Sequence, residues 1–520
     1  MRGMKAPFYL LPLLAAAAAP LHAQEAADFS AAIRKFLPPA KAEVSIPTGE
    51  TTAPAEQAAE ETPAAAEEAP LTFTPDEGPA KDTAPAAHAE EYQKFCALLK
   101  EAGEKNLYDF CPAASMVMNA TNDEFALETW MEKAAAEGIV PAMQYVADRR
   151  MSNIPADKLQ SAPVKEAYAL VRKAADAGYD PAKINVYMCM SMGIGTAKDE
   201  KGAEKYLMEA CKSGTPIPRF KWLQMTGRLA EFADKDRPEV KAEIDRKNHH
   251  VTYFLATKAG TDIEAVEWFK KAAEMGNPEA FYALSAILSH SEPKQSFELL
   301  SQAVKLHSSE AMGVLGNVLT EGNADVLQKT GLQHDDVAGR RMLKLAAMTG
   351  NPAACYWLGK AYSKGEFGLP QNNERAYRHF ETGAVIGSPA CGLAQGIMLL
   401  RGLGVKKDER RALYLLNMAA NDGNPEAVVA LAYALYTGTG VPKDTAKAAE
   451  ILQEAAALQY PRAYVYLAYI TAKDSKEGSF EARQADKYLR KAQLDLSPED
   501  KKKAQELYAS LMKDGWVPEP

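Results

Sequence analysis

Three glycine-containing turns are the parts of the sequence that most nearly match a chemical motif, the phosphate-binding loop. They read G-I-G-T-A-K from Gly193, G-L-G-V-K-K from Gly402 and G-T-G-V-P-K from Gly438. A phosphate-binding loop needs a strand before it and a Ser or Thr directly after its lysine. Here a helical pattern comes first, and the residues that follow are Asp199, Asp408 and Asp444. Aspartate repels phosphate and caps helices by accepting amide hydrogen bonds, so we interpret these segments as turns between helices.

Residues that could bind a metal or act as catalytic bases are sparse. His249 and His250 are adjacent, which would point them about 100° apart on a helix, and Asp245 lies four residues before the first. Two histidines do not make a zinc site, and the sequence contains no H-E-x-x-H segment. It also lacks a G-x-S-x-G elbow and an S-x-x-K motif with its companion motifs. We therefore expect no metal, no cofactor and no enzymatic activity, and a surface helix around the two histidines.

Length and charge narrow the class of protein. A chain of 520 residues is too long for one compact core, so several domains or one elongated array are expected. Its 47% hydrophobic and 25% charged residues are typical of folded protein. Of the net charge of −9, residues 41–90 carry −9 and residues 1–40 carry +2, which leaves residues 91–520 close to neutral. A nucleic-acid-binding protein needs a basic face, so we expect no nucleic-acid partner.

The first 23 residues have the pattern of a secretory signal. Arg2 and Lys5 precede an apolar run from residue 6 to residue 19, and Ala23 offers a small residue before Gln24. An uncleaved membrane anchor is the alternative, but the run is shorter than the roughly 20 residues that a spanning helix needs. We expect cleavage after Ala23 and an exported protein, periplasmic or secreted, with no membrane span in its mature form.

Residues 24–90 are expected to form a disordered linker rich in Ala, Pro, Glu and Thr. Residues 41–90 contain seven prolines and almost no large apolar side chain, so they cannot bury enough surface to offset their ordering entropy. Residues 28–37 place four apolar side chains on one helical face, which would allow a small docking helix or only a marginal one.

After residue 90 the sequence is an internal repeat, most evident in 351–387, 388–423 and 424–459. Each of these stretches has two helical patterns separated by a glycine-containing turn. In the first helix a small residue is followed by Leu at +4, Gly or Ala at +5, a large apolar residue at +8 and Gly at +11. The second helix ends in Ala-Ala-x-x-Gly or a variant of it. This spacing predicts pairs of helices that bury one face of each against their neighbours.

The residues that end the second helices set the repeat boundaries: Gly138, Gly178, Gly214, Gly276, Gly350, Gly387 and Gly423, with His307, Gln459 and Leu496 in degenerate copies. We expect a solenoid over 91–520 with about ten helix-turn-helix repeats, at 109–138, 139–178, 179–214, 215–276, 277–307, 308–350, 351–387, 388–423, 424–459 and 460–496. The long fourth unit should add a helix from Pro238 to Lys258. Capping helices are expected at 89–103 and within 497–515, where Ser497 is the N-cap.

The repeat motif, small-x3-Leu-Gly-x2-Tyr-x2-Gly-x-Gly-Val-x2-Asp followed by Ala-Ala-x2-Gly, resembles the Sel-one-like repeat, a relative of the tetratricopeptide repeat. The similarity covers 139–496 and, more weakly, 109–138. The resemblance implies an all-α fold, an α/α solenoid wound into a right-handed superhelix. It also implies a protein that works by binding, as an adaptor in envelope assemblies, signalling or host contact.

In the related tetratricopeptide arrays, positions +2, +6, +9 and +10 of the first helices line the concave groove. The corresponding residues here are mainly tyrosines with a few cations, which are favoured at interfaces. The alternative is that several of them pack against adjacent repeats. The expected partner-binding residues are Tyr282, Asn317, Tyr356, Lys360, Arg401, Tyr433, Tyr436 and Tyr469.

A cysteine-rich branch of the resembled family, linked to β-lactam binding and hydrolysis, pairs the −3 position of one repeat with a residue eight further on. Cys211 occupies that position here, but Arg219 stands eight residues later. Of the six cysteines, Cys96 and Cys111 are the one pair that we expect to bridge, and the others are expected to be small core residues.

We therefore expect a non-catalytic, exported scaffold of the bacterial cell envelope. Its partner is expected to be a protein or peptide, or else a glycan or envelope polymer. A β-lactam-binding hydrolase is the alternative, which turnover of a chromogenic β-lactam would reveal.

Overall fold

A computed structural model describes most of the chain after residue 82, and every element in the described part is a helix. The expected signal peptide and nearly all of the expected linker lie outside the described residues. The all-α solenoid predicted from the sequence is confirmed. The structure describes residues 83–152, 158–212, 238–322, 324–330, 332–421, 424–457, 460, 462–473, 475–476, 479–494, 497–518 and 520.

The first helices of the three most regular repeats, α19 (Pro352–Lys364), α21 (Pro389–Arg401) and α23 (Pro425–Thr437), each have a local start and stop signal. In α19 the side chain of Asn351 accepts a hydrogen bond from the third amide of the helix, and Pro352 fills the first position, which needs no donor. Gly365 ends the helix with φ of 71°, a left-handed conformation that glycine adopts without strain. The same arrangement recurs in α21 after Ser388 and in α23 after Asn424.

The glycine turns that look like phosphate loops have a structural purpose. Gly402 ends α21 with φ of 72°, and Asp408 caps the next helix by accepting a hydrogen bond from the amide of Arg411 at 2.9 Å. A Cβ on Gly404 would collide with the backbone of Asn373, at the start of the previous repeat's second helix. The second glycine therefore allows the turn to lie directly on the preceding repeat. The same capping is made by Asp199 and Asp444.

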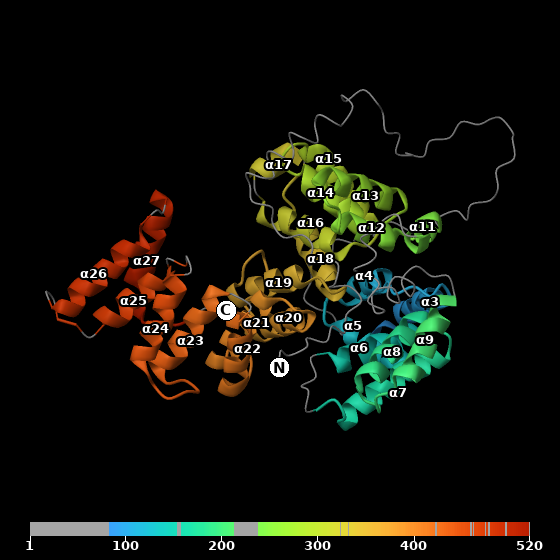
Figure 1. The fold of residues 1–520 in the computed structure, drawn as a ribbon, viewed down its shortest axis with the longest axis horizontal. Coiled ribbons are helices and arrows are strands. Elements are labelled where there is room, and N and C mark those ends of the chain that lie inside the picture. Colours follow the sequence, from blue (N-terminus) through green and yellow to red (C-terminus); the bar gives the residue numbers. More distant parts are fainter. Residues whose placement is uncertain are drawn as a thin grey trace. The chain divides into compact units, whose positions relative to one another are not determined.

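The helices form two compact units, Met1–Thr349 and Gly350–Pro520, where the sequence suggests one array. In the first unit, most helices pack against the next helix in the chain (Figure 1). Its elements are η1 (Pro85–His88), α3 (Ala89–Glu104), α4 (Cys111–Thr121), α5 (Ala126–Ala136), α6 (Val140–Met151), α7 (Ala162–Asp176), α8 (Asp180–Met192), α9 (Glu200–Lys212), α11 (Pro238–Asp245), α12 (His249–Thr257), α13 (Asp262–Glu274), α14 (Pro278–Leu288), α15 (Pro293–Lys305), α16 (Ser309–Glu321), α17 (Ala324–Thr330) and α18 (Asp336–Met348).

The first unit also contains contacts that a simple stack of repeats would not make, because stacked repeats touch only their neighbours. Helix α18 packs against α4, more than 200 residues earlier in the chain. Lys344 on α18 forms an ion pair with Glu124, 3.2 Å between Nζ and Oε2, and both side chains are largely buried. The Nδ1 atom of His307 lies 2.6 Å from Oδ2 of Asp109.

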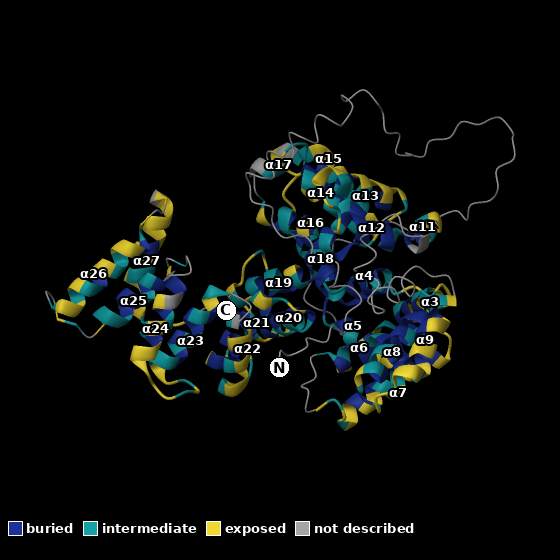
Figure 2. Cartoon of the chain, in the orientation of Figure 1, coloured by how far each residue is buried: buried dark blue, intermediate teal, exposed yellow. Residues whose placement is uncertain are grey.

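The second unit consists of helix pairs, and its described residues contain α19 and α21, whose bounds are given above, and seven other helices. These are α20 (Asn373–Ile386), α22 (Glu409–Asn421), α23, α24 (Thr445–Ala457), α25 (Arg462–Ala472), α26 (Phe480–Ala492) and α27 (Pro498–Asp514). Buried residues lie along the faces where successive helices meet, and they are mostly the alanines and leucines of the repeat motif (Figure 2). Small side chains let the helix axes approach closely, which explains why the motif needs them.

The helix expected at 238–258 and the residues expected to end the second helices can be compared with the structure. The expected helix from Pro238 to Lys258 is wrong as a single helix: it is divided into α11 and α12, because Lys247 has φ of 56° and Asn248 caps a new start. Residues assigned to the ends of second helices have positive φ at Gly138, Gly178, Gly276, His307, Gly350 and Gly387. Gly214, Gly423, Gln459 and Leu496 lie outside the described residues.

Candidate partner-binding face

The first helices of the second unit bring most of the expected site residues onto one set of neighbouring elements. Helix α19 carries Tyr356 and Lys360, α21 ends at Arg401, α23 carries Tyr433 and Tyr436, and α25 carries Tyr469. Helix α21 contacts both α19 and α23. The rings of Tyr436 and Tyr469, from α23 and α25, have centroids 6.2 Å apart. The repeat therefore places these residues on first helices that contact one another.

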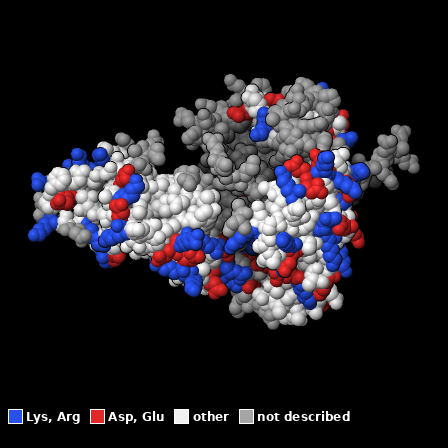
Figure 3. All heavy atoms as spheres, turned by 60° about the horizontal axis from the view of Figure 1, so that its bottom comes forward, with Lys and Arg blue, Asp and Glu red and all other residues white. Residues whose placement is uncertain are grey.

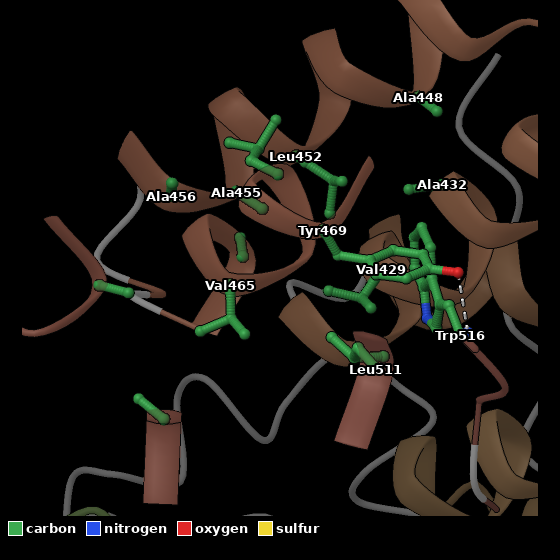
Figure 4. Close-up of a cluster of buried hydrophobic side chains, with 14 residues drawn as sticks. Val429, Ala432, Ala448, Leu452, Ala455, Ala456, Val465, Tyr469, Leu511 and Trp516 are labelled. Atoms are coloured by element: carbon green, nitrogen blue, oxygen red, sulfur yellow. Dashed lines mark hydrogen bonds between the residues drawn. The ribbon is translucent and has the colours of Figure 1, made fainter. Parts of the chain in front are cut away.

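The tyrosines of α23 and α25 surround one tryptophan that the sequence analysis did not select. The ring centroid of Trp516 lies 5.5 Å from that of Tyr433, 5.8 Å from Tyr436, 4.9 Å from Tyr466 and 6.4 Å from Tyr469. Figure 4 shows the indole beside Tyr469. We call Arg401, Tyr433, Tyr436, Tyr466 and Tyr469 the tyrosine face.

Segment 515–518 follows the end of α27 and lies against this face. The amide of Trp516 donates a hydrogen bond of 3.3 Å to Oη of Tyr469. Further along, Nη1 of Arg401 donates to the carbonyl oxygen of Pro518 at 2.9 Å. Trp516 and Pro518 are buried, whereas Val517 between them is 47% exposed. Alternate residues thus face the helices, as in any extended chain laid on a surface.

Cations border the aromatic part of the face. Lys473 Nζ lies 5.6 Å from the ring centroid of Tyr436 and 5.5 Å from that of Tyr469, and Lys443 Nζ lies 5.8 Å from Tyr436. Hydrogen bonds to the hydroxyl groups of Tyr469 and Tyr436 raise the pKa of Lys473. These ammonium groups remain exposed, so they are available to an acidic ligand.

The exposure of the expected residues is uneven. Tyr433 and Tyr436 are half-buried, Arg401 is exposed, and Tyr469 is only 1% exposed. Tyr469 is therefore not an accessible contact residue while Trp516 lies over it, which corrects its expected role. Trp516 and Pro518 were missed because they lie after the last repeat, and Tyr466 because it stands at +3 from Ala463, which is not one of the four groove positions. The signal that could have revealed Trp516 is its position directly after Gly515, the glycine that ends α27.

On α19, Tyr356 and Lys360 are also half-buried. The ring of Tyr356 packs against Trp357 and Phe380, with centroids 6.4 and 6.0 Å away, and burial raises the pKa of its hydroxyl. The ammonium group of Lys360 lies 5.4 Å from the ring of Trp357. These residues present aromatic edges and one cation, which fits a surface for protein contacts.

In the first unit, Tyr282 on α14 and Asn317 on α16 lie on two first helices that contact each other. Both side chains are half-buried. Burial, together with the nearby Glu310 and Glu279, raises the pKa of Tyr282. The Oδ1 atom of Asn317 is buried without a hydrogen-bond partner among the described residues.

The other candidates for chemistry have structural roles. His249 Nδ1 lies 2.9 Å from Asn277 Nδ2, and burial lowers the pKa of its imidazole. Within the described residues no group of three His, Cys, Asp or Glu side chains could hold a metal. Cys96 and Cys111 are both buried thiols, so the expected bridge is not formed in this structure.

One carboxyl group in the first unit, that of Asp148, is buried and has a strongly altered pKa. Asp148 on α6 is buried, and burial raises its pKa to about 7 in spite of three hydrogen bonds that favour the charge. The donors are Tyr108 at 2.5 Å, Gln144 at 2.9 Å, and Asn185. This cluster is a buried hydrogen-bond network that joins α6 to α8 and to the segment before α4.

The charge pattern on one face and the apolarity of the described helices bear on nucleic-acid and membrane binding. On the face shown in Figure 3, Lys and Arg lie interspersed with Asp and Glu rather than forming a basic stripe. No described helix combines the length and apolarity needed to cross a bilayer.

An array of helix pairs that pack through small residues is the architecture of a helical-repeat protein. Comparison with known protein families identifies the kind of repeat. The family model "Sel1 repeat" matches residues 164–179, 186–215, 262–277, 352–384, 390–424 and 425–460. The last three coincide with the three stretches in which the sequence repeat is most evident. The chain therefore carries Sel1 repeats, the Sel-one-like repeats predicted from the sequence.

Similar proteins include the chitin synthase regulator SKT5 of Saccharomyces cerevisiae, 27% identical over 299 residues. That match covers 49% of this chain and 39% of the yeast protein, so the chain spans well under half of that relative. Among solved structures are c5321 of uropathogenic Escherichia coli, a protective antigen with an SLR fold, and a Sel1 repeat protein from Oxalobacter formigenes. For c5321 the identity is 19%, the coverage 81% of this chain and 95% of that one, and the TM-score 0.36. For the Oxalobacter protein the identity is 23%, the coverage 57% of this chain and 88% of that one, and the TM-score 0.33.

Proposed function

We propose that this chain is a non-catalytic scaffold that is exported to the bacterial cell envelope and binds a protein or peptide partner on the first helices of its second unit. Sel1 repeats are a scaffold suited to protein–protein interaction. The observation that carries the proposal is segment 515–518, which lies on the tyrosine face with a buried tryptophan and a hydrogen bond to Arg401. A surface that holds an extended segment of its own chain has the chemistry to hold one from another protein.

Export is proposed from the N-terminal pattern, in which a short positive region, an apolar run and Ala23 before Gln24 follow one another. The near-neutral repeat region and the linker with its excess of acidic residues suit a domain held at a distance from its N-terminus. A glycan or envelope polymer in place of a protein partner would meet the same tyrosines, which stack on sugars as readily as on side chains.

Affinity capture from envelope extracts, followed by mass spectrometry, tests the proposal when the intact protein is compared with face variants. Tyr433→Ala combined with Tyr436→Ala should weaken capture of a specific partner by about 1–3 kcal/mol, the scale of an interface hot spot. Because both tyrosines pack on Trp516, Arg401→Glu is the second variant, which changes an exposed residue. Tyr414→Ala is the matched control, since Tyr414 is 64% exposed on a second helix, α22. Equal capture by all variants would contradict the proposal.

A further inference from the structure

We propose that the tyrosine face recognises an extended partner peptide with a tryptophan followed two residues later by a proline, and that segment 515–518 occupies this site in cis until such a partner displaces it. The inference rests on the proposed function, because it specifies the chemistry of the partner and a control of access to the same face. The chain itself supplies the model ligand, Gly-Trp-Val-Pro.

The contacts define what such a ligand must offer. The indole of Trp516 is enclosed by aromatic rings from α23 and α25, and the side chain is 5% exposed. Its backbone amide and the carbonyl of Pro518 bond to Tyr469 and Arg401, so the peptide is also fixed through its main chain. The residue between them points outward and can vary. An aromatic anchor together with main-chain hydrogen bonds is the usual basis of extended-peptide recognition.

Segment 515–518 is an imperfect occupant. The Nε1 atom of Trp516 is buried with no hydrogen-bond partner among the described residues, and a buried donor without an acceptor is costly compared with a solvated one. Lys443 and Lys473 beside Tyr436 remain exposed and would favour an acidic side chain in the ligand. A partner peptide that supplies an acceptor or an acidic group can therefore bind better than the chain's own segment.

Tethering makes the segment an effective competitor in spite of this defect. Gly515 has φ of 82° and follows α27 directly, so a very short connection delivers Trp516 to the face. A short tether gives an effective concentration on the order of millimolar. A free peptide must therefore bind the intact chain much more weakly than a chain whose segment is withdrawn.

The test uses a fluorescently labelled peptide of residues 514–520, Asp-Gly-Trp-Val-Pro-Glu-Pro, and measures its anisotropy. The intact chain is compared with Trp516→Ala and with a variant in which a protease site engineered between Asp514 and Gly515 is cleaved after folding. We expect both altered proteins to bind the peptide at least about tenfold more tightly than the intact chain. A peptide with alanine in place of its tryptophan, or Tyr433→Ala added to Trp516→Ala, should reduce binding at least about tenfold.

Equal binding to the intact and altered proteins, or no binding to either altered protein, would overturn the inference. The cleaved chain keeps every residue that folded with it, so loss of fold in Trp516→Ala would not obscure the result. A dimer of the intact chain in light scattering that Trp516→Ala abolishes would assign the segment to a second copy and overturn the arrangement in cis. If the peptide fails but partner capture still depends on Tyr433, the proposed function stands and only this inference is lost.

Discussion

Replacing Asp148 by Asn should remove a pH-dependent loss of stability from the first unit. Burial raises the pKa of this carboxyl group from 3.8 to about 7 in the folded state. The contribution of this group to the free energy of unfolding is therefore fully present below about pH 4, near the pKa of the unfolded chain, and it is lost as the pH rises through about 7. By linkage, this single group should cost about 2.5 kcal/mol of stability between about pH 5 and pH 8.

The side chain of Asn is a neutral mimic of the protonated acid at this position. Gln144 donates through Nε2 to both oxygens of Asp148, and its Oε1 is buried without a hydrogen-bond partner in the described structure. Turning the Gln144 amide by 180° would place that oxygen where the new side-chain amide of the Asp148→Asn variant can donate to it. The substitution should therefore stabilise the first unit at both pH values, and by about 2.5 kcal/mol more at pH 8 than at pH 5.

Amide hydrogen exchange of α6 and α8 measures this effect locally, because comparison at equal pH cancels the intrinsic exchange rate. We expect Asp148→Asn to slow exchange at both pH values, with a slowing relative to the original protein that is about 50- to 100-fold larger at pH 8 than at pH 5. Asp176→Asn is the matched control, since the side chain of Asp176 is 55% exposed, and it should not change the pH dependence. Faster exchange of Asp148→Asn at pH 8 would refute the reasoning, because it would mean that the ionised carboxylate stabilises the fold.

Three further predictions concern the turn, the contact between α4 and α18, and the N-terminus. Gly404→Ala should destabilise the second unit by more than about 2 kcal/mol in urea unfolding, because the new methyl group would collide with the backbone of Asn373. Gly276→Ala is the comparison: its φ is 82° and no atom lies within 4 Å of the new Cβ, so it should cost only about 1–2 kcal/mol. Lys344→Met should destabilise the first unit by about 3–5 kcal/mol, since it removes the ammonium group that pairs with the buried Glu124. If Lys344→Met and Glu124→Leu together cost as much as the single change, the ion pair is not the cause. Intact-mass measurement of the native protein should show a chain beginning at Gln24, and a retained Met1 would contradict the signal peptide.

The repeat and its turns could be predicted from the sequence because their determinants are local. Asp408 caps the helix that begins at the next residue, and Gly402 ends the helix directly before it. The periodic alanines and leucines then fix which face of each helix is buried. Such signals act within one or two turns of helix, so no knowledge of distant residues is needed to find them.

The contacts that set the candidate site apart from other repeats are long-range, and no local pattern encodes them. Trp516 meets Tyr433 from 83 residues away, and Arg401 reaches Pro518 over 117 residues. The ion pair of Lys344 with Glu124 joins residues that are still farther apart in the sequence. The template selected Tyr469 because its position along the helix was right, but its burial depends on a segment that lies outside every repeat.

Site-specific photocrosslinking tests most directly whether the first helices of the second unit are the partner-binding surface. A photoreactive phenylalanine analogue is placed at position 360 or 433, on first helices, and at position 414, on a second helix, in cells that make the protein. We predict that positions 360 and 433 form covalent adducts with one and the same partner protein, and that position 414 does not. Adducts with that partner at position 414 and none at positions 360 and 433 would contradict the account.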